Sequence, residues 1–508
     1  MTKRHGTTVA VIGAGVGGLA AAARLAAAGF DVHVFERGSA PGGRCGRVTL
    51  GPFRFDLGPT LLLMPEVLEE TFAAVGHRLQ DHLRLTRCDP NYRIHFADGS
   101  YATFTSELTA MGRELERIEP GSFTHYLRFL ARGHVQYTTS LERFVGRNFD
   151  HLGQFLTPAN LLAVLDVRAH RKMYAEVSRY FADERLRAAL SFQTMYLGIS
   201  PFDGPAVYGL LPFTELAHGI WYPDGGLHEI PRALARVAEE LGVTIHYESA
   251  VRRIDVAGGR ATGCTLADGR RVAADVVLCN ADLPWAYRNL IAPEASRLRG
   301  AGRLRYTSSA YMMYLGTSRT FPALVHHNVF FGRDYRSSFD DLFHRLRVPA
   351  DPSFYVNVAA RTDAGVTPAG RDGVYVLVPV PHRDARIDWA AEGTRLRAHV
   401  LARLAACGAD LRDAIEAERH ITPDDWAETL NLERGAAFGL SHDFFQVGVF
   451  RPANQDPNVR NLFFVGASTQ PGTGLPMVLL SARLATERIL RQAGVPVPAP
   501  AAPGRRAA

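Results

Sequence analysis

Residues 9–36 read VAVIGAGVGGLAAAARLAAAGFDVHVFE, and this stretch decides the fold. A short apolar run leads into a Gly-x-Gly-x-x-Gly motif formed by Gly13, Gly15 and Gly18. An alanine-rich segment follows, and then a second apolar run that ends in Glu36. This order predicts a strand, a tight turn, a helix and a second strand.

The three glycines and the acid have separate roles in this pattern. The first glycine allows the tight turn, the second lets the backbone approach a pyrophosphate, and the third lets the helix pack closely on the strand. The helix N-terminus offers free N–H groups and a partial positive charge to the phosphates. Glu36 stands about 20 residues beyond the glycines, where an acid accepts hydrogen bonds from a ribose hydroxyl. We therefore predict a dinucleotide-binding domain of the Rossmann type.

The composition is that of a globular chain with two or three domains. It has 508 residues, of which 47% are hydrophobic and 21% are charged, so an ample core is expected. The formal net charge is +6. We expect no nucleic-acid partner, because the basic residues are scattered arginines rather than a cluster with interleaved aromatics. A mildly basic surface suits anionic lipid equally well.

Cysteine and histidine positions give no metal site at this level. The five cysteines are scattered without a CxxC pair, which indicates no disulfide framework and fits a reducing cytosol. Adjacent residues of a strand point to opposite faces, so we expect His326 and His327 to be structural rather than joint metal ligands. No apolar run reaches the roughly 18 residues of a transmembrane helix, and the glycines near the N-terminus argue against a secretory signal.

The middle of the chain is predicted to be a long, mostly helical insert, covering residues 61–218, because charged and apolar residues alternate there at helical spacing. Within it, residues 155–165 form an apolar, weakly charged stretch. Thr157 is the expected cap, and Pro158 fits the first turn of a helix. Two interpretations stand: a helix of the core, or a helix that lies in the surface of a bilayer.

The remaining pattern predicts a small sheet, a second sheet and a C-terminal strand–loop–helix unit. A helix is expected at residues 231–241, and Asp268-Gly269 is typical of a hairpin turn. Strands are predicted at residues 243–247, 251–256, 260–266, 272–279, 308–314, 374–379 and 461–466. The last of them ends in Gly466, and after a loop a helix is predicted at residues 475–492.

Beyond these patterns, the chain resembles the bacterial and fungal phytoene desaturases, a carotenoid-forming branch of the FAD-dependent, amine-oxidase-like flavoproteins. The resemblance spans nearly the whole chain. The segments that carry it are residues 13–36, 41–44, 55–60, 191–202, 219–226, 280–282, 375–381, 450–452 and 466–476. One departure is Gln470, which stands where many relatives have histidine and which can hydrogen-bond but cannot titrate.

The resemblance implies FAD as the cofactor. In relatives, a Gly-Gly-Arg segment borders the flavin, and a residue at the position of Val251 contacts the adenine through its backbone. The N-terminus of the C-terminal helix favours negative charge on the flavin pyrimidine edge. The implied cofactor-binding residues are Gly13, Gly15, Gly18, Glu36, Gly42, Gly43, Arg44, Gly58, Pro59, Thr60, Val251, Gly466, Gly474, Leu475, Pro476 and Met477.

The implied fold class is α/β, with a Rossmann-type FAD-binding domain, an inserted α+β substrate domain and a helical membrane-associated region. We expect the FAD-binding domain in three parts, at residues 1–75, 219–290 and 436–493. The helical insert takes residues 76–218, the substrate-domain sheet residues 291–435, and a disordered tail residues 494–508.

The implied reaction removes a hydride and a proton from saturated C–C bonds of a carotene precursor such as phytoene. The substrate is a hydrophobic isoprenoid, so we expect an apolar tunnel and a membrane surface as partner. An electron acceptor such as oxygen or a quinone is also implied. The expected location is peripheral, on the cytoplasmic face of a membrane.

Several alternatives stay open at this point. Asp56, Glu215 and Asp224 lie in family-like segments, but acids at element ends are more often caps, so no catalytic base is assigned. A sister enzyme on the same scaffold is an alternative: a later-step desaturase, an isomerase, a terminal oxidase or ketolase, or a true amine oxidase, although no aromatic cage is evident near Gly472. A non-catalytic prenyl-binding protein is a third interpretation, against which the complete FAD pattern argues. The number of desaturation steps and a 30- or 40-carbon substrate also stay open.

Overall fold

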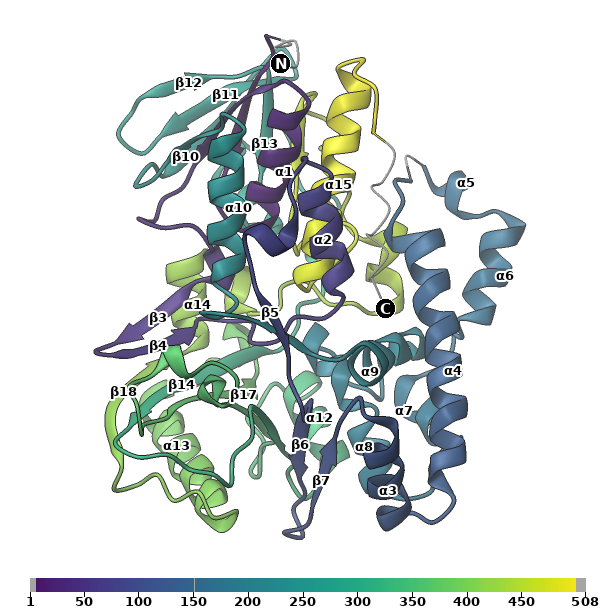
Figure 1. Cartoon of the computed structure of the whole chain (residues 1–508). Helices are drawn as coiled ribbons and strands as arrows, with labels where there is room; N and C mark the ends of the chain where they lie inside the picture. The colour runs from purple at the N-terminus through teal and green to yellow at the C-terminus, as the bar shows by residue number, and fades with distance from the viewer. Residues whose placement is uncertain (1–5, 150, 499–508) are drawn as a thin grey trace.

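A parallel five-stranded sheet forms the upper body of the protein (Figure 1). The computed structural model describes residues 6–149 and 151–498. Of the predicted disordered tail, residues 499–508 lie outside the described residues, and residues 495–498 form no helix or strand. In sheet order, the five strands are β19 (Leu462–Phe464), β13 (Val276–Cys279), β1 (Thr8–Ile12), β2 (Asp31–Phe35) and β9 (Thr244–His246).

This sheet is the middle of three layers, as period-two alternation requires. Val9 and Val11 of β1 pack with one set of helices, while Ala10 packs with Cys264 and Leu266 of a small antiparallel sheet. The helices are α1 (Val16–Ala27), α2 (Pro65–Ala73), α10 (Glu229–Glu240) and α15 (Leu475–Gln492). The small sheet consists of β10 (Val251–Ala257), β11 (Arg260–Leu266) and β12 (Arg271–Ala273).

The Rossmann-type prediction is confirmed element by element. Helix α15 has the predicted bounds, and β11 begins and ends where expected. The hairpin turn between β11 and β12 is confirmed, with Gly269 at φ +90°.

The prediction of one strand at residues 272–279 is wrong. The chain changes sheets there, because Ala274 N still donates to Thr262 O of the small sheet, at 3.0 Å. Asp275 already pairs with the parallel sheet: its N–H donates to Thr8 O, and its carboxylate accepts from Thr8 N, each at 2.9 Å. A largely apolar segment, interrupted by Asp275, therefore contains a transfer between two layers, which periodicity alone does not reveal.

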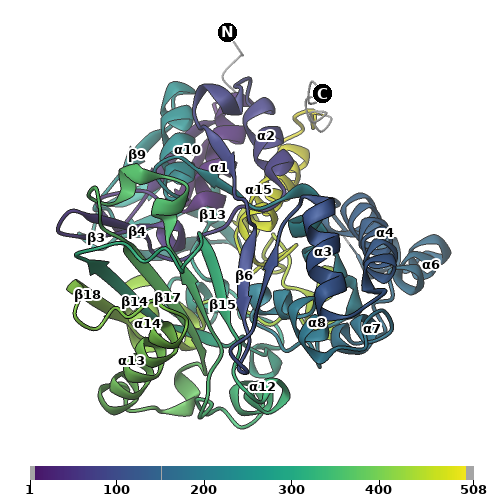
Figure 2. The same ribbon diagram turned by 60° about the horizontal axis from the view of Figure 1, so that its bottom comes forward.

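A seven-stranded sheet forms the lower body, and helix α13 (Trp389–Ala406) covers one of its faces (Figure 2). All neighbouring strands are antiparallel except β15 and β6, which are parallel. In sheet order the strands are β18 (Ile415–Ile421), β14 (Ser309–Thr317), β17 (Gly373–Val380), β16 (Phe354–Asn357), β15 (His327–Phe330), β6 (Tyr92–His95) and β7 (Tyr101–Phe104).

The two faces of this sheet have different partners. On β14, Tyr311, Met313 and Leu315 pack with the leucines and valines of α13. Ala310 and Met312 point the other way and pack with the hairpin of β3 (Arg47–Leu50) and β4 (Phe53–Asp56). The remaining helices outside the insert are α11 (Leu283–Asn289), α12 (Tyr335–Phe343) and α14 (Pro423–Leu430). Strand β8 (Trp221–Pro223) pairs with β5 (Leu85–Arg87), which belongs to the insert.

The predicted helical insert is mostly helical, but it also supplies β6 and β7 to the lower sheet. Its helices form the third lobe of the molecule (Figure 1). They are α3 (Leu108–Ile118), α4 (Ser122–Ser140), α5 (Leu152–Phe155), α6 (Pro158–Asp166), α7 (Met173–Val177), α8 (Glu184–Ala189) and α9 (Leu210–Phe213).

Helix α6 begins as predicted, at Pro158, and the Thr157 hydroxyl caps it by accepting from Asn160 N at 3.2 Å. The core-helix interpretation is wrong, since Leu162 and Leu165 are 66% and 57% exposed. No helix among the described residues combines the length and apolarity needed to cross a bilayer.

Candidate functional site

A cavity of about 770 Å³ lies where the upper body, the lower body and the helical insert meet. We call it the central cavity. Its wall draws on the carboxyl ends of the parallel strands, on the lower sheet and on helices of the insert. Ligands of open parallel sheets bind at this edge of the strands. Every predicted cofactor-binding residue lines the central cavity except Gly18.

Gly18 has the packing role that the motif assigns to it. A Cβ at this position would lie 2.3 Å from Gly13 O, so any other residue would push helix α1 off the first strand. Gly18 therefore sets the distance between α1 and β1 without reaching the cavity.

The N-terminus of α1 is open toward the central cavity. Gly15 is its N-cap and provides no side chain to bind the free N–H groups. A Cβ on Gly15 would lie 2.6 Å from Asn280 Nδ2, and one on Gly17 would lie 2.9 Å from Asn280 Oδ1. Asn280 follows β13 and was not among the predicted site residues. The absence of side chains at Gly15 and Gly17, together with the uncapped N-terminus of α1, fits a pyrophosphate.

Glu36 lies at the end of β2, beside this turn. Its carboxylate accepts from Ala14 N and Gly38 N, both at 2.8 Å, which fixes it at the cavity wall. The Gly-Gly-Arg segment docks on the same turn, because Gly42 N donates to Ala14 O at 2.9 Å. The residues around Glu36 therefore fit the ribose of a dinucleotide.

A second uncapped helix N-terminus faces the same cavity, that of α15. Its N-cap is Gly474, at φ +108° with no capping side chain. The preceding loop is held by Arg451, which is 2% exposed. The guanidinium donates to five carbonyl oxygens, those of Leu440, Ser441, Gln446, Ala467 and Thr469. Burial lowers the pKa of Arg451 to about 10, so it stays charged near neutrality.

His442 also stabilises the loop that precedes α15. Its Nε2 accepts from Thr473 N at 3.0 Å, and burial holds the pKa of His442 well below its usual value, so the ring is neutral. A Cβ on Gly472 would lie 2.7 Å from the same nitrogen. Gln470 does not line the cavity, and its amide donates to Arg451 O at 3.3 Å. Gln470, which stands where many relatives have histidine, therefore contacts the loop backbone rather than the cavity.

Arg44 and Asp282 form the charged part of the wall. Burial lowers the pKa of Arg44 and raises the pKa of Asp282, and the attraction between the two charges opposes both shifts. Asp282 also accepts from the Ser468 hydroxyl and from Glu433 N. Asp282, like Asn280 and Arg451, was not predicted as a site residue.

The rest of the wall is apolar. It comes from the insert, from the inner face of the lower sheet and from α12, and includes Phe192, Met195, Leu211, Val329, Phe331 and Leu377. Tyrosine hydroxyls interrupt it: Tyr355 OH bonds Thr60 Oγ1 at 2.8 Å. A wall of this kind suits a long hydrocarbon with no polar handle.

None of the three acids considered in the sequence lines the central cavity. Asp56 accepts from Leu227 N and His228 N, and burial raises its pKa to about 7. Asp224 pairs with Arg84 at the surface. Glu215 is fully buried, and Gln193 Nε2 donates to it at 3.1 Å. The structure thus assigns caps and internal hydrogen bonds to these acids.

Burial raises the pKa of Glu215 to about 7, because the charged form is poorly solvated. Its protonated form therefore stabilises the fold below the unfolded pKa, and this contribution is lost as the pH rises through 7. Glu215→Gln should gain about 2–3 kcal/mol in unfolding free energy relative to wild type between pH 5 and pH 8. Denaturant unfolding of both proteins at pH 5 and pH 8 measures this difference in unfolding free energy.

The control is Glu239→Gln, at an exposed position of α10. We expect this variant to follow the wild type at both pH values. An equal pH dependence of Glu215→Gln and wild type would contradict the assignment.

The comparisons with known proteins agree with this geometry. Residues 16–490 match the family described as flavin-containing amine oxidoreductase. A zeta-carotene-forming phytoene desaturase of Myxococcus xanthus is 62% identical over 96% of this chain and 94% of its own. An all-trans-zeta-carotene desaturase of the same organism is 36% identical over 96% of this chain and 94% of its own.

Among solved structures, a putrescine oxidase variant superposes with a TM-score of 0.64. The match covers 96% of this chain and 99% of the oxidase, at 16% identity, and therefore supports the fold alone. The family match and the sequence relatives identify the cofactor as well as the fold: it is FAD. The chain belongs to the flavin-containing amine oxidoreductases, and within them to the carotenoid desaturases of the phytoene desaturase type.

Proposed function

We propose that this protein is an FAD-dependent phytoene desaturase whose product is zeta-carotene. The observation that carries the proposal is the 62% identity to a zeta-carotene-forming enzyme over nearly the whole chain. A later-step enzyme is disfavoured, because the zeta-carotene desaturase of the same bacterium is only 36% identical.

FAD would be held at both ends by the open helix termini. The N-terminus of α1 would bind the pyrophosphate and Glu36 the adenosine ribose, with Val251 beside the adenine. Residues 42–44 and the N-terminus of α15 would border the ring system. Bound there, FAD supplies a two-electron acceptor for a hydride.

The reaction takes one hydride and one proton from adjacent carbons, so that a C–C single bond becomes a double bond. The protein's own contribution is to hold the polyene against the ring and to exclude water. The apolar wall around Phe192, Val329 and Phe331 would position the chain by burial alone. The electrons must then leave the cofactor, and oxygen or a quinone is the proposed acceptor.

An apolar patch on the surface supports docking on a membrane. We define it by eight exposed side chains on α5, α6 and a nearby loop. They are Leu152, Leu156, Leu161, Leu162, Leu165, Phe444, Phe445 and Phe450. Phe445 is 79% exposed. The insert and the loop are joined there, since the rings of Phe155 and Phe450 lie 6.4 Å apart. Clustered exposed apolar side chains mark interaction sites, and a bilayer is the proposed partner.

The patch also leads to the central cavity. Leu141, Val145 and Val447 line the cavity. Phe144, beside Val145, lies 5.7 Å from Phe155, the ring that contacts Phe450 of the patch, measured between ring centroids. A carotene precursor dissolved in the bilayer would thus reach the cavity without crossing water. The five cysteines are all unpaired, which fits the proposed cytoplasmic side of the membrane.

Gly15→Ala tests the cofactor site. The added Cβ would lie 2.6 Å from Asn280 Nδ2, at the turn that would receive the pyrophosphate. We expect purified protein with less than about a tenth of the wild-type flavin, because the helix terminus can no longer approach the phosphates. Gly302→Ala is the control, since a Cβ there meets nothing within 4 Å. Full flavin content in Gly15→Ala would contradict the site.

Val329→Trp tests the substrate part of the cavity. Val329 lines the cavity from β15 and is 7% exposed. The indole would fill space proposed for the polyene, so phytoene conversion in a phytoene-accumulating host should fall at least about tenfold while flavin is retained. Val329→Leu is the conservative control. The wild type should accumulate zeta-carotene, and its absorption spectrum identifies the product.

Unchanged phytoene in the host, together with conversion of a more coloured carotene, would overturn the proposed function in favour of a later-step enzyme. Undiminished conversion by Val329→Trp would place the substrate elsewhere.

Replacing Leu162 and Leu165 together by Asp tests the membrane patch. Two leucines each contribute about 1.5–3 kcal/mol when buried, so binding to anionic vesicles should weaken at least about tenfold, while the flavin content stays unchanged. Co-sedimentation with vesicles measures it. The control is Leu108→Asp on α3, a leucine that is 49% exposed but lies outside the patch. Equal losses in both variants would contradict docking through this patch.

A further inference from the structure

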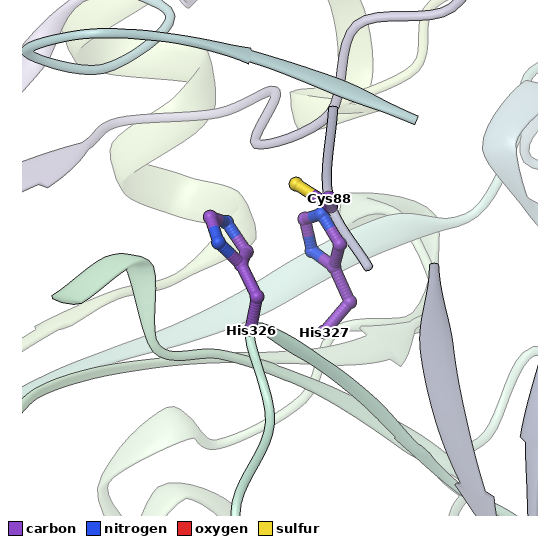
Figure 3. Close-up of side chains that lie close together, drawn as sticks. All are labelled: Cys88, His326 and His327. Carbon is purple, nitrogen blue, oxygen red and sulfur yellow. The ribbon is translucent and has the colours of Figure 1, made fainter. Parts of the chain in front are cut away.

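Cys88, His326 and His327 converge at one point (Figure 3), and none of the three lines the central cavity. Each offers one ligand atom, and the three atoms lie within 4.8 Å of one another. The expectation that the histidines point to opposite faces is wrong. His327 opens β15, but His326 precedes it in a bend, so the two ring centroids are only 4.2 Å apart.

The three side chains are buried, with exposed fractions of 1% for Cys88, 4% for His326 and 1% for His327. Among residues 6–149 and 151–498, the Nε2 atoms of both histidines have no hydrogen-bond partner. Buried polar atoms are nearly always satisfied, and an orphan pair beside a thiol calls for a ligand. Zinc and related cations supply that ligand to imidazole and thiolate groups.

The opposite ring nitrogens are already held. His326 Nδ1 is bonded to Thr362 Oγ1 and His327 Nδ1 to Tyr355 OH, each at 2.6 Å. Metal-bound histidines are typically oriented by such a second hydrogen bond, which leaves Nε2 free for the metal.

We propose that Cys88, His326 and His327 bind a zinc ion. Three nitrogen and sulfur ligands leave a fourth position for water, and small side-chain rotations would bring the ligand atoms to the roughly 3.5 Å separation of a tetrahedral site. Binding releases the Cys88 proton to solvent and forms two Zn–N bonds and one Zn–S bond.

The site would join distant parts of the chain. Cys88 lies on the connection between β5 and β6, while the histidines lie at the start of β15, to which β6 pairs. Through His327, Tyr355 and Thr60, it also adjoins the wall of the central cavity. The ion would fix the β5–β6 connection and orient Tyr355.

The test uses the full-length flavoprotein, purified without a metal-affinity step. Elemental analysis should find about one zinc per chain in the wild type. After chelation, added Co²⁺ should give a sulfur-to-cobalt charge-transfer band in the difference spectrum, and d–d bands at longer wavelengths than flavin absorbs. Cys88→Ser should lose the charge-transfer band. The matched control is Cys264→Ala, a buried cysteine in β11 that should keep it.

A second variant separates ligation from folding. Thr362→Val removes the hydroxyl on His326 Nδ1 but no ligand, so zinc affinity should fall roughly 10–100-fold while the charge-transfer band persists at saturating Co²⁺. Wild-type protein that contains no zinc and gives no charge-transfer band would overturn the proposal. A band that survives in Cys88→Ser would also overturn it.

Discussion

The structure depends on how closely helix α1 approaches the strand before it. A Cβ at Gly18 would meet Gly13 O at 2.3 Å, so the contact exists only between glycine and backbone. This approach sets the uncapped end of α1 at the carboxyl edge of the sheet, next to Asn280. The open N–H groups are costly without an anion, and the dinucleotide is the ligand that such an arrangement accepts.

A second constraint is that successive side chains of each strand in the lower sheet point to opposite faces. One set of strands therefore serves two functions. On β17, Val374, Val376 and Val378 pack toward α13, while Tyr375 and Leu377 face the central cavity. The sheet is stabilised on one face by a continuous core and presents its other face to a ligand. The core between the sheet and α13 therefore also holds the apolar cavity wall in place.

The sequence allowed the parts governed by local rules to be predicted, including the glycine turn, Glu36, the caps and the bounds of α15. The errors arose where tertiary contacts decide. Asp275 moves the chain from one sheet to another, and a bend before β15 turns His326 toward His327. Asn280, Asp282 and Arg451 were missed because their roles come from loops that meet only in the fold. Arg451 lies in one of the segments that carry the family resemblance, but its role depends on five carbonyl oxygens from separate loops, which the sequence alone does not bring together.

The position of the apolar patch follows from the same physical constraint as the cavity wall. A carotene precursor of about 40 carbons gains tens of kcal/mol in leaving water, at about 0.8 kcal/mol for each CH₂ group. A route through solvent would therefore stop the reaction, whatever the chemistry at the flavin. In the proposed function the entrance opens on lipid: Leu141, Val145 and Val447 line the cavity, and Phe144, beside Val145, packs against Phe155 next to the apolar patch. We propose that the polar end of the cavity, with Glu36 and the open end of α1, holds the cofactor, so that the hydrocarbon occupies the apolar end of the same cavity.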